Sequence, residues 1–110
     1  MALSYKVLGQ VNPSDTNNAN LYTVPSGTST VVSTLVLTNV TATDAVARMY
    51  VRKEAAAAST DNAIAYDVTV AANSLNTFTL GITLGATDVL TVHSATANAL
   101  AFHLFGSEIS

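Results

Sequence analysis

Hydrophobic and polar residues alternate with a period of two along most of this 110-residue chain. This is the pattern of β-strands that bury one face. The longest stretch, residues 29–40, consists almost entirely of Val, Thr, Leu and Ser, and β-branched residues at this density favour a pleated strand over a helix. Apolar residues occupy both its odd and its even positions, which indicates a central strand with neither face plainly turned to solvent.

Seven further stretches of the same kind predict shorter strands, at residues 5–11, 21–24, 45–53, 64–70, 75–80, 88–93 and 99–105. Turn-forming residues such as Pro25, Ser26 and Gly27 separate them. Only four residues part the 29–40 strand from the 45–53 strand, so we expect these two to form an antiparallel hairpin. Strands spaced about 8–12 residues apart, with no amphipathic helix between them, are typical of an all-β antiparallel sandwich, jelly-roll or immunoglobulin-like. A closed β-barrel is the alternative.

Two segments depart from the strand pattern. Residues 54–63 include four consecutive alanines, and because alanine is the best helix former, one helical turn is expected there. Residues 12–20 are rich in Asn, Asp, Ser and Thr and predict a long polar loop. We take both segments as candidate contacts with a partner, and in the second we single out Asp15, Asn17 and Asn18. No linker divides the chain, so residues 1–110 are expected to form one domain.

Composition changes this picture, because 49% of the residues are hydrophobic and only 10% are charged, against about a quarter in ordinary soluble domains. Thr, Ser and Asn must therefore supply most of the polar surface. These neutral groups tolerate burial against another protein better than charged groups do. The composition favours a subunit of an assembly, and we expect the chain to associate with itself.

Charge and hydropathy exclude several classes of partner. The net charge is −3 and only four Lys and Arg residues are present, which is unsuited to neutralising nucleic-acid phosphates. No stretch approaches the roughly 18 apolar residues that a membrane span requires, so neither nucleic acid nor membrane is an expected partner. Cysteine is absent, which removes disulfides, thiolate metal sites and cysteine nucleophiles.

Motifs for catalysis or cofactor binding are also missing. A search for a nucleophile elbow, a P-loop, a dinucleotide fingerprint and a His-Glu-x-x-His helix finds none. His93 and His103 fall in successive predicted strands, where a simple hairpin would place His93 opposite Leu100, so we expect them not to share a metal. The sequence predicts no enzyme, no cofactor and no metal site.

Three of the four cations gather within six residues. Arg48, Tyr50 and Arg52 would share one face of a strand by alternation, with Lys53 at its end. One interpretation is a patch that binds carboxylates of a partner, because Arg offers bidentate hydrogen bonds and Tyr and Arg are frequent at binding hot spots. The other is a solvated strand face on which the cations pair with Asp67, while the neighbours of Asp67 point into the core. The sequence leaves both open.

Several short segments together resemble a known class of protein. They are Tyr-Lys-Val-Leu-Gly-Gln at 5–10, Leu-Tyr-Thr-Val-Pro at 21–25, Thr-Leu-Val-Leu-Thr-Asn at 34–39, Ala-Thr-Asp-Val at 86–89 and Phe-Gly-Ser-Glu-Ile at 105–109. The chain resembles small all-β virion structural proteins of tailed phages, of the kind found in phages of cyanobacteria. The resemblance runs from end to end and is weakest in the middle loop.

This resemblance implies a non-enzymatic capsid decoration, or cement, protein that forms a homo-oligomer, expected to be a trimer. Its partners would be itself and the major capsid protein or another virion protein, and its location the virion, assembled in the host cytoplasm. A neck, tail, baseplate or fibre component is an alternative within the same class. A receptor- or glycan-binding module is an alternative from another class, although four Tyr, three Phe and no Trp would make a thin sugar platform.

Overall fold

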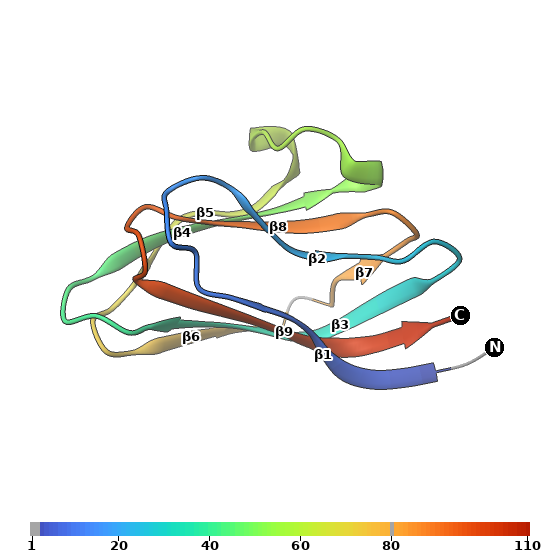
Figure 1. The fold of residues 1–110 in the computed structure, drawn as a ribbon, viewed down its shortest axis with the longest axis horizontal. Helices are drawn as coiled ribbons and strands as arrows, with labels where there is room; N and C mark the ends of the chain where they lie inside the picture. The colour runs from blue at the N-terminus through green and yellow to red at the C-terminus, as the bar shows by residue number, and fades with distance from the viewer. Residues whose placement is uncertain (1–2, 80) are drawn as a thin grey trace.

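A computed structural model describes residues 3–79 and 81–110, which form two antiparallel sheets packed face to face (Figure 1). Sheet A contains β1 (Leu3–Val11), β3 (Ser29–Asn39), β6 (Leu75–Phe78), β7 (Thr83–Leu84) and β9 (Leu100–Ile109). Sheet B contains β2 (Ala19–Thr23), β4 (Ala45–Arg52), β5 (Ala63–Val70) and β8 (Val89–Ser94). The predicted all-β sandwich is therefore confirmed. No helix in the described ranges is long and apolar enough to cross a membrane.

The order of the strands is that of a jelly roll. It runs β1-β9-β3-β6 in sheet A, with β7 also paired to β3, and β2-β8-β4-β5 in sheet B. The chain changes sheet at most of its connections, so strands that are neighbours in sequence usually face each other across the core. The first and last strands of the described chain, β1 and β9, lie side by side.

This order contradicts the predicted hairpin between the 29–40 and 45–53 strands. β3 lies in sheet A and β4 in sheet B, and the segment between them crosses the sandwich. Asn39 fixes the crossing, since its buried side-chain amide donates to the carbonyl oxygens of Thr43 at 2.8 Å and Val70 at 3.0 Å. Its Oδ1 accepts from the backbone N–H of Thr41 at 2.9 Å. The Asn39 side chain therefore supplies hydrogen bonds to backbone groups of the crossing segment, which a hairpin turn would otherwise make within itself.

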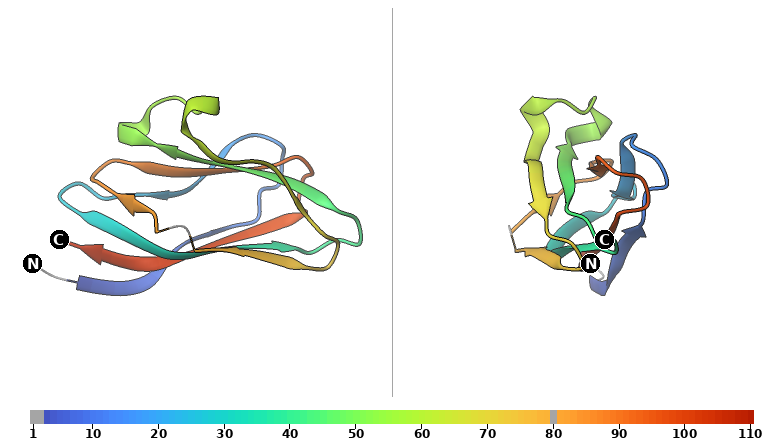
Figure 2. Two further views of the ribbon diagram at one scale, coloured as in Figure 1. Left: turned by 180° about the vertical axis from the view of Figure 1, so that it is seen from behind. Right: turned by 90° about the vertical axis from the view of Figure 1, so that its left-hand side faces the viewer.

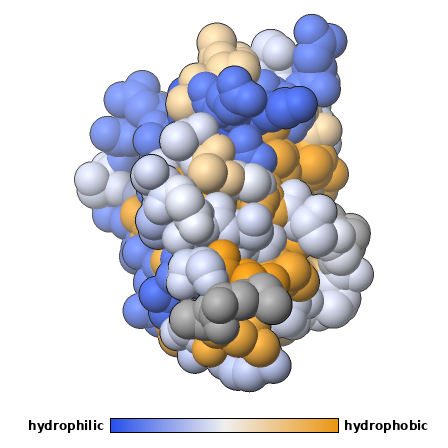
Figure 3. Space-filling model, turned by 90° about the vertical axis from the view of Figure 1, so that its right-hand side faces the viewer, coloured by the Kyte–Doolittle hydropathy of each residue, from blue (hydrophilic) through white to orange (hydrophobic). Residues whose placement is uncertain are grey.

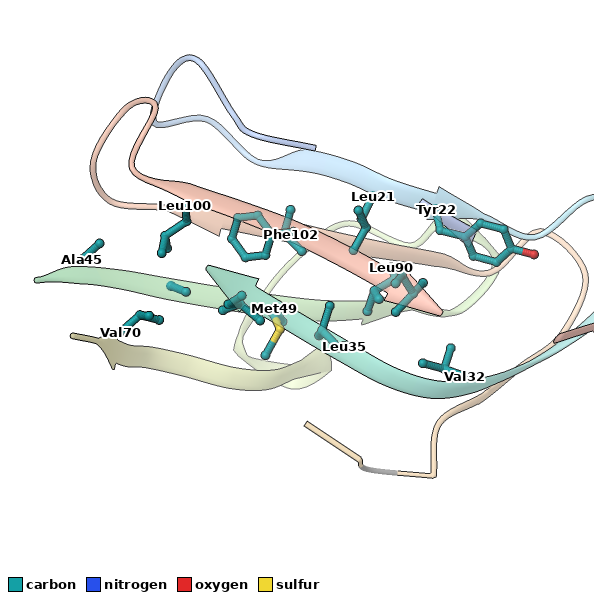
Figure 4. Packing of buried hydrophobic residues seen from close by; sticks show 14 of the residues in the cluster. Leu21, Tyr22, Val32, Leu35, Ala45, Met49, Val70, Leu90, Leu100 and Phe102 are labelled. Atoms are coloured by element: carbon teal, nitrogen blue, oxygen red, sulfur yellow. The ribbon is translucent and has the colours of Figure 1, made fainter. Parts of the chain in front are cut away.

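The core lies between the inner faces of the two sheets. In β9, Leu100, Phe102 and Leu104 are completely buried and alternate with partly exposed residues, as one-sided burial requires. Figure 4 shows Phe102 and Leu35 from sheet A meeting residues of sheet B such as Met49 and Leu90. Close packing of this kind makes each of these side chains costly to shorten.

A β-bulge explains why apolar residues occupy both phases of β3. Its pairing with β9 shifts between Val32 and Thr34, so Ser33 is an extra residue. Val32 faces the core before the bulge, and Leu35 and Leu37 face it after the bulge. The central position of this strand is confirmed, because β9 lies on one side of it and β6 and β7 lie on the other.

Several boundaries differ from the predictions. β9 continues to Ile109, four residues beyond the predicted end, and the two-residue strand β7 was not foreseen. The 53–62 excursion contains two 3-10 turns, η1 (Lys53–Ala55) and η2 (Thr60–Asn62), and the alanines at 56–58 belong to neither. The end of the predicted 75–80 strand, Leu80, lies outside the described residues.

Candidate interaction surfaces

Arg48 lies on the outer face of sheet B and already has a carboxylate partner. Its Nε donates to Oδ1 of Asp67 at 2.7 Å, and its guanidinium carbon lies 4.0 Å from the centre of the Tyr66 ring. The hydrogen bond from Arg48 holds the pKa of Asp67 below its ordinary value. The pairing between Arg48 and Asp67 that the second interpretation predicted is thus confirmed.

A bulge in β5 places Tyr66 on the same outer side as Asp67. Asp67 has a φ of 56°, and the pairing with β4 steps from Ala47 opposite Val68 to Met49 opposite Ala65, which leaves one extra residue in β5. The expectation that Tyr66 points into the core is wrong, because its exposed fraction is 48%. Strict alternation fails wherever a bulge inserts a residue.

The structure also contradicts the exposed position predicted for Tyr50, which is only 6% exposed. Tyr50 lies on a central strand, opposite Thr91 of β8 and Ala63 of β5, and the pairing with β5 is irregular at this point. The excursion between β4 and β5 rises over the same outer face of sheet B (Figures 1 and 2). Tyr50 is therefore unavailable as an exposed hot spot in this conformation.

Arg52 binds the protein's own backbone. Its Nε donates to the carbonyl oxygen of Ala56 at 2.7 Å, and its Nη2 donates to that of Ala55 at 3.2 Å. Its Nη1 donates to Asn20 Oδ1 at 3.1 Å and to Thr91 Oγ1 at 3.2 Å. Arg52 thus fastens the excursion to β2 and β8 with one planar guanidinium.

Replacing Arg52 with lysine is therefore expected to loosen residues 53–56 while the sandwich stays folded. A lysine ammonium keeps the charge but cannot reproduce a planar set of donors aimed at four acceptors. Hydrogen–deuterium exchange should rise in the excursion and remain unchanged in β3 and β9. Unchanged exchange at residues 53–56 would contradict this role of Arg52, and Lys53→Arg serves as the control because Lys53 is exposed.

The remaining predicted contacts are exposed but lie on different parts of the molecule. Lys53 begins η1 beside Arg52. Asp15, Asn17 and Asn18 are exposed in the loop between β1 and β2, where the Asn17 N–H donates to Asp15 Oδ1 at 3.0 Å. Their binding of a partner, like that of Arg48, Tyr50 and Arg52, stays a prediction.

The two histidines lie on different sheets, so the predicted hairpin that paired His93 with Leu100 is wrong. His93 is opposite Arg48 in sheet B, and His103 is opposite Val36 in sheet A. The His103 ring stacks on Phe105 with 6.4 Å between centroids, and its Nδ1 lies 3.1 Å from Gln10 Nε2. Among the described residues no group of three acidic, histidine or cysteine side chains could hold a metal ion.

The outer face of sheet A is a surface that sequence analysis missed. We call it the neutral face, because none of the described side chains that alternation directs to it belongs to Asp, Glu, Lys or Arg. β1 also has a bulge, because its pairing with β9 shifts between Val7 and Gly9. Alternation, together with this bulge and that of β3, directs the following side chains to the neutral face: Leu3, Tyr5 and Val7 of β1, Val31, Thr34, Val36 and Thr38 of β3, Leu75 and Thr77 of β6, and Ala101, His103, Phe105 and Ile109 of β9.

Several of these side chains are both apolar and exposed. The exposed fractions are 79% for Tyr5, 57% for Leu75 and 52% for Leu3. A groove of about 440 Å³ runs between Tyr5, Val31 and Phe105, and Lys6 also contributes to its lining. Seen from the end at which both termini lie, hydrophobic residues are exposed in the lower part of the molecule and halfway up one side, and hydrophilic residues cover the top and the other side (Figure 3). A contiguous neutral surface of this kind is unusual in a protein that meets only water.

A signal for this face was present in the sequence. No charged residue occurs between Asp15 and Asp44 or between Asp88 and Glu108. These two runs contain β3 and most of β9, the two central strands of sheet A. The sequence alone does not reveal that they are neighbours.

On the inner side of the same end, Tyr22 connects the two sheets. Its hydroxyl donates to the carboxylate of Glu108 and lies 2.8 Å from Thr30 Oγ1, while Lys6 forms a salt bridge with Glu108. Burial of the hydroxyl, and to a smaller extent its hydrogen bond to Glu108, raises the pKa of Tyr22 to about 12. The hydrogen bond from Lys6 lowers the pKa of Glu108 most, and the hydrogen bond from Tyr22 lowers it further.

The raised pKa predicts that Tyr22 loses its proton well above its ordinary value of 10.0. Because the folded pKa lies above the unfolded one, this group's contribution to stability is complete below pH 10 and is lost as the pH rises through about 12. Ultraviolet absorbance of tyrosinate should show a late step that Tyr22→Phe removes. If the step that Tyr22→Phe removes had its midpoint near pH 10, the prediction would be contradicted.

Comparisons with known proteins find similarity in structure but not in sequence families. No protein-family model matches the chain, and no curated protein is similar to it in sequence. Among solved structures, a chain of the Gt strain of infectious bursal disease virus matches with a TM-score of 0.50 and 10% identity, over 97% of this chain and 32% of that one. A chain of the Gx strain matches with a TM-score of 0.47 and 13% identity, over 97% and 31%. This chain therefore spans about a third of the length of these viral chains, and the match to the Gt strain shows a likeness of fold alone.

Proposed function

We propose that this protein is a non-enzymatic structural protein of a virion, and that it joins the particle through the neutral face of sheet A. The observation that carries the proposal is the unequal distribution of charge. Arg48, Arg52 and Asp67 lie on sheet B, whereas the neutral face consists of apolar and hydroxyl-bearing side chains together with the imidazole of His103. The jelly-roll order and the likeness to a chain of an animal virus support the virion role.

The chemistry of the neutral face suits it to a permanent contact. Apolar side chains gain about 25 cal/mol for each Å² removed from water. Hydroxyl groups such as those of Thr34 and Thr38 can be buried at a lower cost than charges, provided that they find a hydrogen-bond partner. A standard interface buries about 800 Å² on each partner, and in a symmetric shell many such contacts act together.

Within this class, we propose a capsid decoration protein of a tailed phage, with the major capsid protein as its partner. The resemblance to small phage virion proteins supports this role. The polar outer face of sheet B would then point away from the shell. A neck, tail, baseplate or fibre position would use the same face with fewer copies.

The tyrosines give less support to a glycan-binding module. A sugar platform needs exposed aromatic rings, but Tyr22 and Tyr50 are buried and the Tyr66 ring is covered on one side by Arg48. Tyr5 is the one tyrosine that combines high exposure with an apolar surrounding.

The test is incorporation of matched variants into particles of the virus that carries this gene. Val31→Lys places a charge on the neutral face, and Ile64→Lys places one on sheet B at a site of similar exposure, 41% against 37%. Both variants should fold, and only Val31→Lys should be depleted from purified particles. Equal incorporation of the two would refute the role of the neutral face. Mass spectrometry of wild-type particles separates the positions, since a decoration protein should approach the copy number of the shell protein.

A further inference from the structure

Each sandwich has four outer edges, and a strand at an edge offers unpaired backbone groups to other chains. In the described part of the chain, three of these edges are blunted. β6 has four residues, β2 has five and a register shift between Asn20 and Tyr22, and β5 carries the bulge at Asp67. Short length and bulges are the usual means by which proteins protect an edge.

The fourth edge, at the start of β1, lacks such protection. Residues Leu3 to Val7 are all exposed and pair with β9 without interruption. The strand becomes irregular only after Val7, and beyond it Gly9 lies so close to β2 that an added Cβ would be 2.2 Å from the carbonyl oxygen of Leu21. β2 thus approaches β1 closely at Gly9, while Leu3–Val7 pairs with no other described strand on the side away from β9 (Figure 1).

This edge also lacks a free charged side chain that would prevent strand pairing. Lys6 is the one charged residue in the segment, and its ammonium is engaged by Glu108 on the inner side of the sheet. The outward side chains are Leu3, Tyr5 and Val7, all at least half exposed. An edge lysine usually prevents strand pairing by remaining free and solvated, and here an internal salt bridge neutralises it.

We infer that Leu3–Val7 pairs antiparallel with the same segment of a second copy of this chain, about a two-fold axis at Tyr5. The two copies of sheet A then form one continuous sheet. The Leu3–Val7 edge can pair with a second neutral edge without burying an unpaired charge. A charged partner strand would find no free charged side chains of opposite sign on this edge.

The register follows from the sequence of the segment. An axis at Tyr5 places Leu3 opposite Val7 and Ser4 opposite Lys6, so every apolar side chain meets an apolar one and the lysines do not face each other. An axis at Lys6 would bring two like charges directly opposite, which is destabilising. The contact builds dimers, in place of the trimer expected from the resemblance. It does not depend on the proposed virion role, because it is tested on the purified protein.

The experiment uses the absence of cysteine from the chain. Directly opposed residues of antiparallel strands have Cβ atoms about 4.5–5.5 Å apart, close to the separation in a disulfide. Under mild oxidation Tyr5→Cys should therefore form covalent dimers. The control is Leu75→Cys on the opposite edge of sheet A, which is also highly exposed, at 57%, and which should remain largely monomeric.

Mixed variants test the register. Leu3→Cys and Val7→Cys, which differ in mass once one carries a tag, should cross-link to each other much faster than either does to itself. Tyr5→Lys should raise the dimer dissociation constant at least tenfold in light-scattering measurements, with circular dichroism unchanged. A wild-type protein that is monomeric at every concentration, or equal cross-linking of Tyr5→Cys and Leu75→Cys, would overturn the inference.

Discussion

Replacing Phe102 with alanine is expected to lower the free energy of unfolding by about 3–5 kcal/mol. The Phe102 side chain is completely buried in β9, at the centre of sheet A, and points between the sheets toward residues such as Met49 (Figure 4). Truncation removes its apolar contacts and leaves a cavity that two sheets joined by many crossings cannot easily close. Chemical denaturation followed by circular dichroism measures the change.

Leu75→Ala is the control for this prediction, since it also shortens a large apolar side chain. Leu75 is 57% exposed on the neutral face, so its change in an isolated chain should stay within about 0.5 kcal/mol. Similar losses for Phe102→Ala and Leu75→Ala would mean that the core does not lie where the structure places it.

Gly106→Ala is expected to destabilise the fold by at least about 1–3 kcal/mol, although it adds only one methyl group. A Cβ at this position would lie 2.2 Å from the carbonyl oxygen of Val31 and 3.0 Å from the Cα of Val32. Both are backbone atoms of β3, just before its bulge, so the central strands of sheet A would have to separate.

Gly85→Ala is the matched control, because a Cβ there has one neighbour within 4 Å, Asp88 Oδ2 at 3.7 Å, which is an ordinary contact. It should leave the denaturation midpoint nearly unchanged. If Gly106→Ala proved as mild as Gly85→Ala, the close approach of β9 to β3 would be refuted. Exchange measurements should locate the damage of Gly106→Ala in sheet A.

The strands themselves could be predicted from the sequence, because alternation reports one-sided burial directly. Leu100, Phe102 and Leu104 are a clear case. Their partners could not be predicted, since a period of two is the same whichever sheet a strand joins. The short 41–44 connection therefore suggested a hairpin, whereas the buried amide of Asn39 supports a crossing.

The candidate site was predictable only in part, and bulges account for much of the failure. The pairing of Arg48 with Asp67 was one of two interpretations that the sequence left open, and one extra residue in β5 turned Tyr66 outward. The neutral face was missed for another reason. It consists of residues from four strands that are distant in sequence, so its lack of charge becomes visible only when β1, β3, β6 and β9 are assembled.

The place of β9 between β1 and β3 also bears on the time at which the chain can fold during synthesis. Residues 100–109 must leave the ribosome before β1 has any neighbour in sheet A and before β3, which can already pair with β6 and β7, has a neighbour on its other side. Pairing between such distant segments is slow, because loop closure costs entropy before any contact repays it. A translational pause before residues 100–109 have emerged would therefore prolong the exposure of aggregation-prone strands.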